Sequence, residues 1–149
     1  MSDLATTVDE ALEQSIAETF SEMAFVETIP AEEPGEVEES QVFTIDVNGE
    51  RTHRLVMRLG LASKKAIVEN IHGKPWDELH SAEIDDCLLE FLNVLGGSFG
   101  KTLWGDASKY RISFPAVQIE IPEEATGAGA KEYWFDAEGA KFSVVVAEF

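Results

Sequence analysis

The sequence predicts an α+β fold in which long helices pack on one face of a largely antiparallel sheet. Two long segments, residues 3–25 and 83–103, carry apolar residues at helical spacing. Several shorter segments rich in β-branched and aromatic residues are separated by turn signals such as Asn48-Gly49. Strands joined by short turns pair antiparallel, and helices that do not alternate with strands gather on one face. The 149 residues suffice for one hydrophobic core, so we expect a single domain over residues 1–149.

The first helix is expected to begin with Asp3 as its N-cap and to run to about Phe25. Its apolar stripe contains Val8, Leu12, Ile16 and Phe20. After Pro30, the stretch Ala31–Ser40 carries five glutamates and no basic residue. This stretch is therefore predicted to be an exposed acidic loop.

A β-hairpin and a shorter helix are predicted next. Residues 42–47 favour a strand, Asn48-Gly49 favours a tight turn, and residues 52–61 favour the returning strand. Ser63 then begins a helix over residues 64–71, which Gly73 closes.

The longest helix is predicted over residues 83–103, opened by Ser81. At about 100° per residue, five apolar residues fall within about 40° of one direction: Ile84, Leu88, Phe91, Leu95 and Phe99. Gly96-Gly97 permits a bend or the close approach of another backbone. The remaining strands are predicted at 109–114, 117–121, 131–135 and 141–149, with a loop over 123–130 and a turn at 137–139.

The charge balance argues against several classes of partner. The net charge of −18 repels nucleic-acid phosphates and disfavours anionic membrane surfaces. The apolar run Val144–Ala147 is far shorter than a membrane span, and the N-terminus lacks a secretion signal, so we expect a cytoplasmic protein. Cys87 is the single cysteine, so no internal disulfide can form. The three histidines have no metal-ligand spacing and are expected in loops and on the surface: His53, His72 and His80.

A polar stripe lies opposite the apolar stripe of the longest helix. Asp86, Glu90 and Asn93 are spaced i, i+4 and i+7, so they share about 60° of arc, and Gly97 continues the line without a side chain. Taken alone, such a stripe is more typical of a solvated helix face than of an active site.

The spacing of this polar stripe resembles a known sequence signature, which favours a functional role for it. The order and spacing Asp86-x3-Glu90-x2-Asn93-x21-Pro115 resemble the signature of the CheC, CheX and FliY chemotaxis phosphatases. The first helix, the Gly73 and Pro75 loop and the closing strand also resemble CheX, so the resemblance covers nearly the whole chain. Some CheC relatives carry a second Glu-x-x-Asn on the first helix. Here Glu18 is followed by Ser21 instead, which implies one active centre, on the long helix only.

The resemblance implies hydrolysis of the aspartyl phosphate of a phosphorylated CheY-like response regulator. Asn93 would position the attacking water through its amide, since a carboxylate there would repel the phosphoryl group. Glu90 would pair with the regulator's active-site lysine and set the register of the complex. Asp86 and Gly97 would support docking, and Pro115 would shape the backbone after a strand. The chain would need no cofactor, because Mg²⁺ would belong to the regulator, and the CheX relatives imply a homodimer.

Two other functions stay open from the sequence. The first is a non-catalytic adaptor that docks a receiver domain, because the same fold family includes flagellar switch components. The second is a small-ligand sensor, which would need a concave pocket with convergent polar groups, and the sequence indicates no such cluster.

Overall fold

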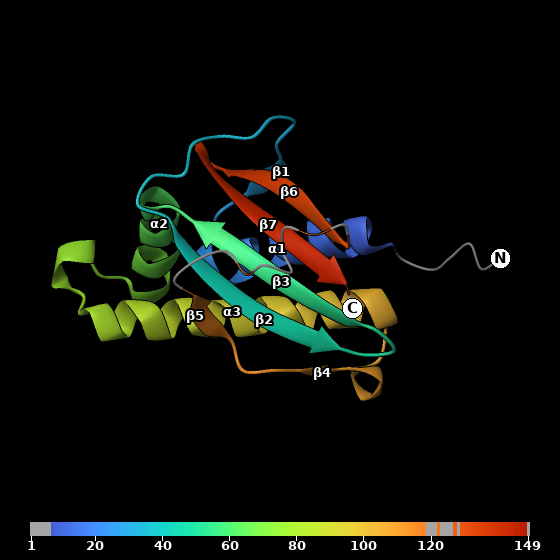
Figure 1. Ribbon diagram of the computed structural model, residues 1–149. Helices are drawn as coiled ribbons and strands as arrows, with labels where there is room; N and C mark the ends of the chain where they lie inside the picture. Colours follow the sequence, from blue (N-terminus) through green and yellow to red (C-terminus); the bar gives the residue numbers. More distant parts are fainter. Residues whose placement is uncertain (1–6, 119–121, 123–126, 128, 149) are drawn as a thin grey trace.

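The computed structural model describes residues 7–118, 122, 127 and 129–148, and within them three α-helices pack against one seven-stranded sheet (Figure 1). The helices are α1 (Val8–Ala24), α2 (Leu61–His72) and α3 (Ser81–Trp104). The strands are β1 (Thr28–Pro30), β2 (Gln41–Asn48), β3 (Thr52–Leu59), β4 (Arg111–Ile112), β5 (Ala116–Gln118), β6 (Ala130–Ala137) and β7 (Ala140–Glu148). Short 3-10 helices lie at Trp76–Glu78 and Ala107–Lys109.

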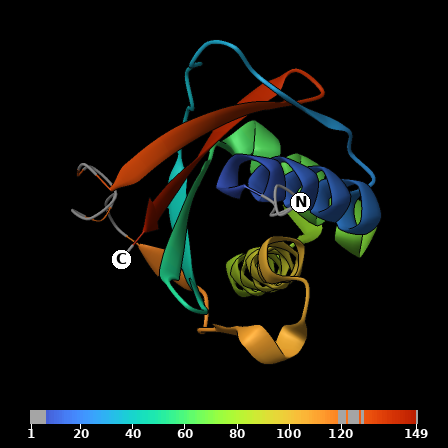
Figure 2. The ribbon, with the colours of Figure 1, turned by 90° about the vertical axis from the view of Figure 1, so that its right-hand side faces the viewer.

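The sheet is antiparallel at each of its pairings, with the order β1-β6-β7-β3-β2-β4 and with β5 also paired to β2. The three α-helices gather on one face of this curved sheet (Figure 2). The main core lies between the two layers and includes a T-shaped contact of Phe20 on α1 with Phe91 on α3. The predicted fold class, helices on one face of a largely antiparallel sheet, is confirmed.

Helix α1 follows its predicted apolar stripe but begins later than expected. The proposed cap Asp3 lies outside the described residues. The helix begins at Val8, and the hydroxyl of its N-cap Thr7 accepts a hydrogen bond from the backbone N–H of Glu10. It ends at Ala24, and the left-handed backbone of the C-cap Phe25 (φ 56°) stops the helix.

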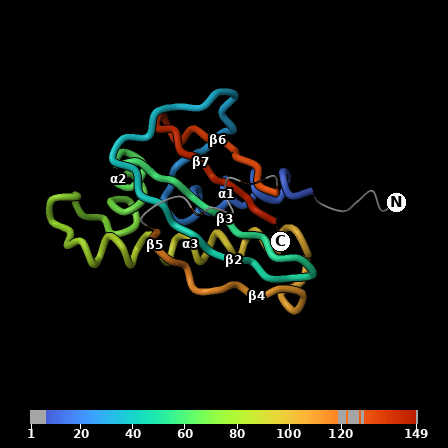
Figure 3. Tube along the Cα trace, viewed as in Figure 1, coloured from blue at the N-terminus to red at the C-terminus, as the bar shows by residue number. Residues whose placement is uncertain are grey.

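The predicted hairpin is present as β2 and β3, which pair from Gln41 with Leu59 to Asn48 with Thr52 (Figure 3). The returning strand is shorter than expected, because Leu61 already opens α2 with Gly60 as the N-cap. Gly73 closes α2 in the left-handed conformation, as predicted.

Helix α3 runs unbroken through Gly96 and Gly97. At its start, the side chain of Glu83 accepts a hydrogen bond from the backbone N–H of His80. The predicted apolar stripe faces the core, with Phe99 fully buried. Gly96 serves close packing rather than a bend, since a Cβ on it would lie 2.9 Å from Cδ1 of Ile45 on β2.

The segment after α3 differs from the prediction. The strand expected over 109–114 begins instead with a 3-10 helix, and only Arg111–Ile112 pair with β2. The strand expected over 117–121 is β5, and residues 119–121 lie outside the described residues. β1 was not predicted at all, because Pro30 and its short length mask it.

His53 corrects another expectation. His72 and His80 are exposed, but His53 is buried on β3 between the rings of Phe99 and Trp104. Its Nε2 lies 3.0 Å from the carboxylate of Glu148. The period-two alternation of β3 places residue 53 on the same side as buried Leu55, a signal present in the sequence but not used there.

Candidate functional site: the polar ridge of helix α3

The polar ridge of α3, defined here as Asp86, Glu90, Asn93 and Gly97, lies on one face of the helix as predicted. Asp86 and Glu90 are exposed, and Asn93 and Gly97 are half-buried. No described residue forms a hydrogen bond or ion pair with the side chains of Asp86, Glu90 or Asn93. These side chains are therefore free to engage a partner molecule.

Gly97 leaves an open space on the ridge. A Cβ added at Gly97 would meet no atom within 4 Å, whereas one added at Gly100 would lie 2.5 Å from the ring of Tyr110. The glycine at 100 is thus required by packing, but the glycine at 97 is not. The gap beside Asn93 is available to a partner that approaches the helix closely.

The segment that follows α3 folds back along it. The hydroxyl of Tyr110 donates a 3.0 Å hydrogen bond to the carbonyl oxygen of Gly97, and the Tyr110 ring stacks on Trp104 at 5.9 Å between centroids. Ile112 lies farther back along α3, since its Cγ2 would be 3.6 Å from a Cβ on Gly96. The chain after α3 therefore runs antiparallel to the helix, towards the turn that carries Asn93.

A β-bulge lies where this segment passes the ridge. Ile112 pairs with Val47 on β2, whereas Ala116 pairs with Thr44. The chain thus advances four residues from 112 to 116 while β2 advances three, from 47 to 44. The extra residue lies within 113–115, opposite Ile45 and Asp46. Because Ile45 also contacts Gly96, this bulge brings Pro115 to the level of the ridge along α3.

One exposed residue at the bulge was missed in the sequence. Phe114 is 95 % exposed, more than any other large apolar side chain of the described residues. The available signal was an aromatic residue directly before proline, a position with a restricted backbone. The sequence prediction instead placed Phe114 at the end of a regular strand.

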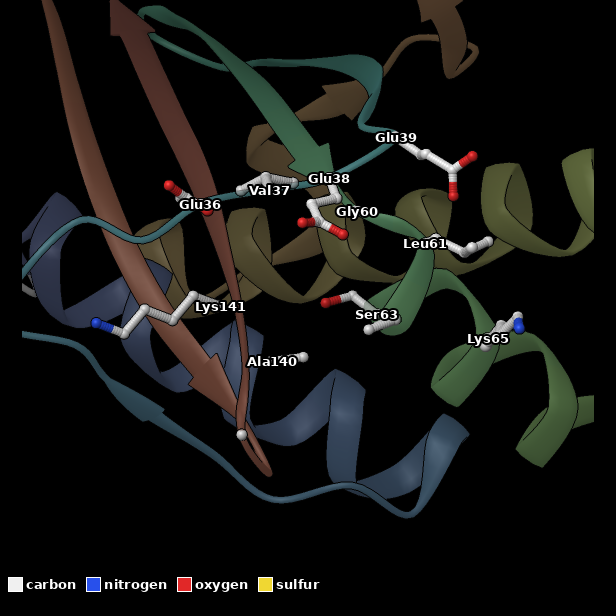
Figure 4. A pocket seen from close by; sticks show the side chains of 12 residues that line it. Glu36, Val37, Glu38, Glu39, Gly60, Leu61, Ser63, Lys65, Ala140 and Lys141 are labelled. Atoms are coloured by element: carbon white, nitrogen blue, oxygen red, sulfur yellow. The ribbon is translucent and has the colours of Figure 1, made fainter.

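One pocket of the described residues lies away from the ridge. It has a volume of about 520 Å³ and is bordered by the acidic loop, the start of α2 and the β6–β7 turn (Figure 4). Its charged lining residues are Glu36, Glu38, Glu39, Lys65 and Lys141. No ridge residue contributes to it.

A second charged cluster joins β3 and β7. Arg51 donates a 2.7 Å hydrogen bond to Glu148, which also contacts His53. Burial lowers the pKa of His53, and the Arg51 hydrogen bond lowers the pKa of Glu148. Across residues 7–118, 122, 127 and 129–148, no group of three or more His, Cys, Asp or Glu is arranged to hold a metal ion. In the same residues, no helix is long and apolar enough to cross a membrane.

No family model matches the chain, and no curated protein matches it at a significant level. Solved structures do match over nearly the full length. CheX from Vibrio vulnificus is 15 % identical with a TM-score of 0.78, covering 97 % of this chain and 98 % of that one. CheX from Desulfovibrio desulfuricans is 12 % identical with a TM-score of 0.74, covering 95 % and 99 %. The CheX chain of a CheX-CheY-BeF3-Mg²⁺ complex from Borrelia burgdorferi is 15 % identical with a TM-score of 0.70, covering 95 % and 97 %.

Two flagellar proteins match less closely: FliY from Thermotoga maritima, with a TM-score of 0.57, and the FliM middle domain, with a TM-score of 0.58. At these identities the similarity speaks for the fold. Across its full length, this chain has the fold of the CheX and CheC-like chemotaxis proteins.

Proposed function

We propose that this protein is a cytoplasmic phosphatase that hydrolyses the aspartyl phosphate of a CheY-like response regulator. The observation that carries the proposal is that Glu90 and Asn93 lie without side-chain partners among the described residues on an accessible ridge of a chain with the CheX fold. Pro115 follows Asn93 at the x21 spacing of the signature. The structure of a CheX-CheY complex supports a receiver domain as the partner class.

In the proposed reaction, Asn93 positions a water molecule in line with the phosphorus–oxygen bond of the aspartyl phosphate. Its amide oxygen accepts a hydrogen bond from the water, which directs the water oxygen towards phosphorus. The bond to the aspartate carboxylate breaks as the bond to water forms, releasing inorganic phosphate and a free carboxylate. The amide carries no charge, so it can approach the phosphoryl oxygens without repulsion.

Glu90 lies one helical turn before Asn93, so the two side chains project side by side, with Cβ atoms about 5–6 Å apart. A lysine ammonium of the regulator would pair with the Glu90 carboxylate and fix the register of Asn93 over the phosphoryl group. Asp86 extends the same acidic face by one turn. Mg²⁺ would be held by the regulator's own carboxylates.

The alternative is a non-catalytic adaptor that docks a receiver domain, and the similarity to the flagellar proteins FliY and FliM favours it. An adaptor would use the same ridge for docking without requiring an amide at position 93. A homodimer, as the CheX relatives imply, is compatible with either function and is tested by the mass of the protein in solution.

The experiment follows phosphate loss from response regulators of the same genome, phosphorylated with a small phosphodonor, with the wild-type chain and with Asn93→Ala. A phosphatase accelerates the loss for at least one regulator, and Asn93→Ala still binds that regulator without the acceleration. Binding with unchanged phosphate lifetime would establish the adaptor, and a complete panel with no binding would overturn both functions.

A further inference from the structure

The feature that neither the proposed chemistry nor the packing of the core uses is Phe114. A phenyl ring that is 95 % exposed makes almost no contact with its own chain. Exposed aromatic side chains of this kind are enriched at the centres of protein interfaces, where they fill apolar pockets of the partner.

Phe114 is held by an ordered backbone. On one side, Ser113 forms two hydrogen bonds with Asp46 on β2: its N–H donates to the Asp46 carbonyl at 2.9 Å, and its Oγ accepts from the Asp46 N–H at 2.9 Å. On the other side, Pro115 restricts the residue before it to extended backbone. The backbone at residue 114 is therefore constrained on both sides, so binding has little backbone freedom left to remove.

The bulge explains why this ring is outside the core. Ile112 pairs with Val47 and Val117 pairs with Phe43, and both β2 partners are buried against the helices. The extra residue between these two pairs interrupts the alternation of the strand, and such bulges re-aim side chains. The aromatic group is thus carried on the edge of the sheet instead of under α3.

The position of Phe114 is next to the polar ridge. The bulge lies opposite Ile45, which contacts Gly96, so Phe114 passes α3 close to the turn of Asn93. On the helix, Val94 is 38 % exposed and lies about 100° around from Asn93, on the side of Glu90. Val94 therefore borders the ridge on the side of Glu90, and the bulge that carries Phe114 lies on the other side, at the level of Gly96.

We propose that Phe114 is the apolar anchor that docks the receiver domain onto the ridge. The proposal rests on the proposed function and specifies the partner's chemistry: a lysine ammonium opposite Glu90 and, beside it, an apolar depression that accepts the Phe114 ring. Pro115 acts as a positioning residue that keeps this ring extended towards the partner.

The test compares Phe114→Ala with Ile29→Ala, an exposed apolar residue (64 %) on β1 at the opposite edge of the sheet. The probe is a CheY-like regulator activated with beryllofluoride, for the dissociation constant, and the same regulator phosphorylated, for kcat and KM. Phe114→Ala is expected to raise the dissociation constant and KM about tenfold or more, a loss of about 1.4 kcal/mol, with kcat within about twofold of wild type. Ile29→Ala leaves all three quantities unchanged.

The outcomes separate this inference from the proposed function. If wild type dephosphorylates a regulator and Phe114→Ala has the same KM, Phe114 is no anchor, although the phosphatase proposal stands. If the regulator binds without being dephosphorylated and Phe114→Ala weakens binding, the anchor stands and the adaptor replaces the phosphatase. If Phe114→Ala converts a dimer into a monomer with unchanged regulator affinity, the ring docks a second copy of this chain and the inference is overturned.

Discussion

The hydroxyl of Tyr110 donates a 3.0 Å hydrogen bond to the carbonyl oxygen of Gly97, within the polar ridge. The Tyr110 ring occupies the space that a side chain at position 100 would need. One tyrosine thereby fixes the distance between α3, which carries Asn93, and the returning segment, which carries Phe114 and Pro115.

Tyr110→Phe removes only this hydrogen bond and keeps the ring on Gly100 and Trp104. We expect the free energy of unfolding to fall by about 1 kcal/mol, the usual contribution of one hydrogen bond. Gly100→Ala should cost more, because the new methyl group would lie 2.5 Å from the Tyr110 ring. Urea denaturation measures the free energy of unfolding, which should decrease from wild type to Tyr110→Phe to Gly100→Ala. Equal stability of Tyr110→Phe and wild type would contradict a contribution from this hydrogen bond.

Gly97→Ala is expected to raise the stability of the protein and to weaken its interaction with the regulator. Because the added Cβ meets no atom within 4 Å, the substitution should stabilise the helix by up to about 1 kcal/mol. If a partner approaches the ridge at this gap, the same methyl group should raise KM for the phosphorylated regulator severalfold. Gly96→Ala is the contrasting variant, since its Cβ would clash with Ile45 and destabilise the protein. A variant at 97 that is more stable and equally active would show that the gap is unused.

Asn93 and Glu90 should respond differently to substitution. Asn93→Asp keeps the size of the side chain but adds a charge facing the phosphoryl group, so we expect kcat to fall about 10²-fold or more. Glu90→Gln should mainly raise KM, because it removes the charge that pairs with the regulator's lysine. Stopped-flow measurement of dephosphorylation over a range of regulator concentrations resolves the two constants. Equal effects of both substitutions on kcat alone would contradict the division of roles.

The sequence was sufficient for the three α-helices, for the β2–β3 hairpin and for the ridge. The stripes of α1 and α3, the Asn48-Gly49 hairpin and the placement of Asp86, Glu90 and Asn93 on one face depend on local periodicity, which a single sequence displays. The bulge at 113–115 could not be predicted, because it is a difference between two strand pairings with β2. The alternation of β3 was a sequence signal for the inward position of His53, but its contacts with Glu148 and Trp104 could not be predicted, because only the fold brings these distant residues together.

The buried His53 leads to a prediction for stability against pH. Burial lowers its pKa in the folded protein, whereas in the unfolded chain it titrates near 6.5. Below about pH 6.5, His53 therefore binds a proton in the unfolded chain but stays neutral in the folded protein until the pH reaches its lowered pKa. The free energy of unfolding should fall as the pH decreases from 6.5 towards the lowered pKa, with a slope of at most about 1.4 kcal/mol per pH unit.

His53→Phe keeps an aromatic ring between Phe99 and Trp104 but removes the titration, so its stability should change less with pH between about 7 and 5.5. His72→Gln, at an exposed histidine of α2, is the matched control and should retain the wild-type slope. Below about pH 4.5 all three proteins should lose stability further, because the Arg51 hydrogen bond lowers the pKa of Glu148 and protonation of that carboxylate favours the unfolded chain. Urea titrations at half-unit pH steps measure these slopes. A His53→Phe slope equal to that of wild type would show that another titratable group causes the acid sensitivity.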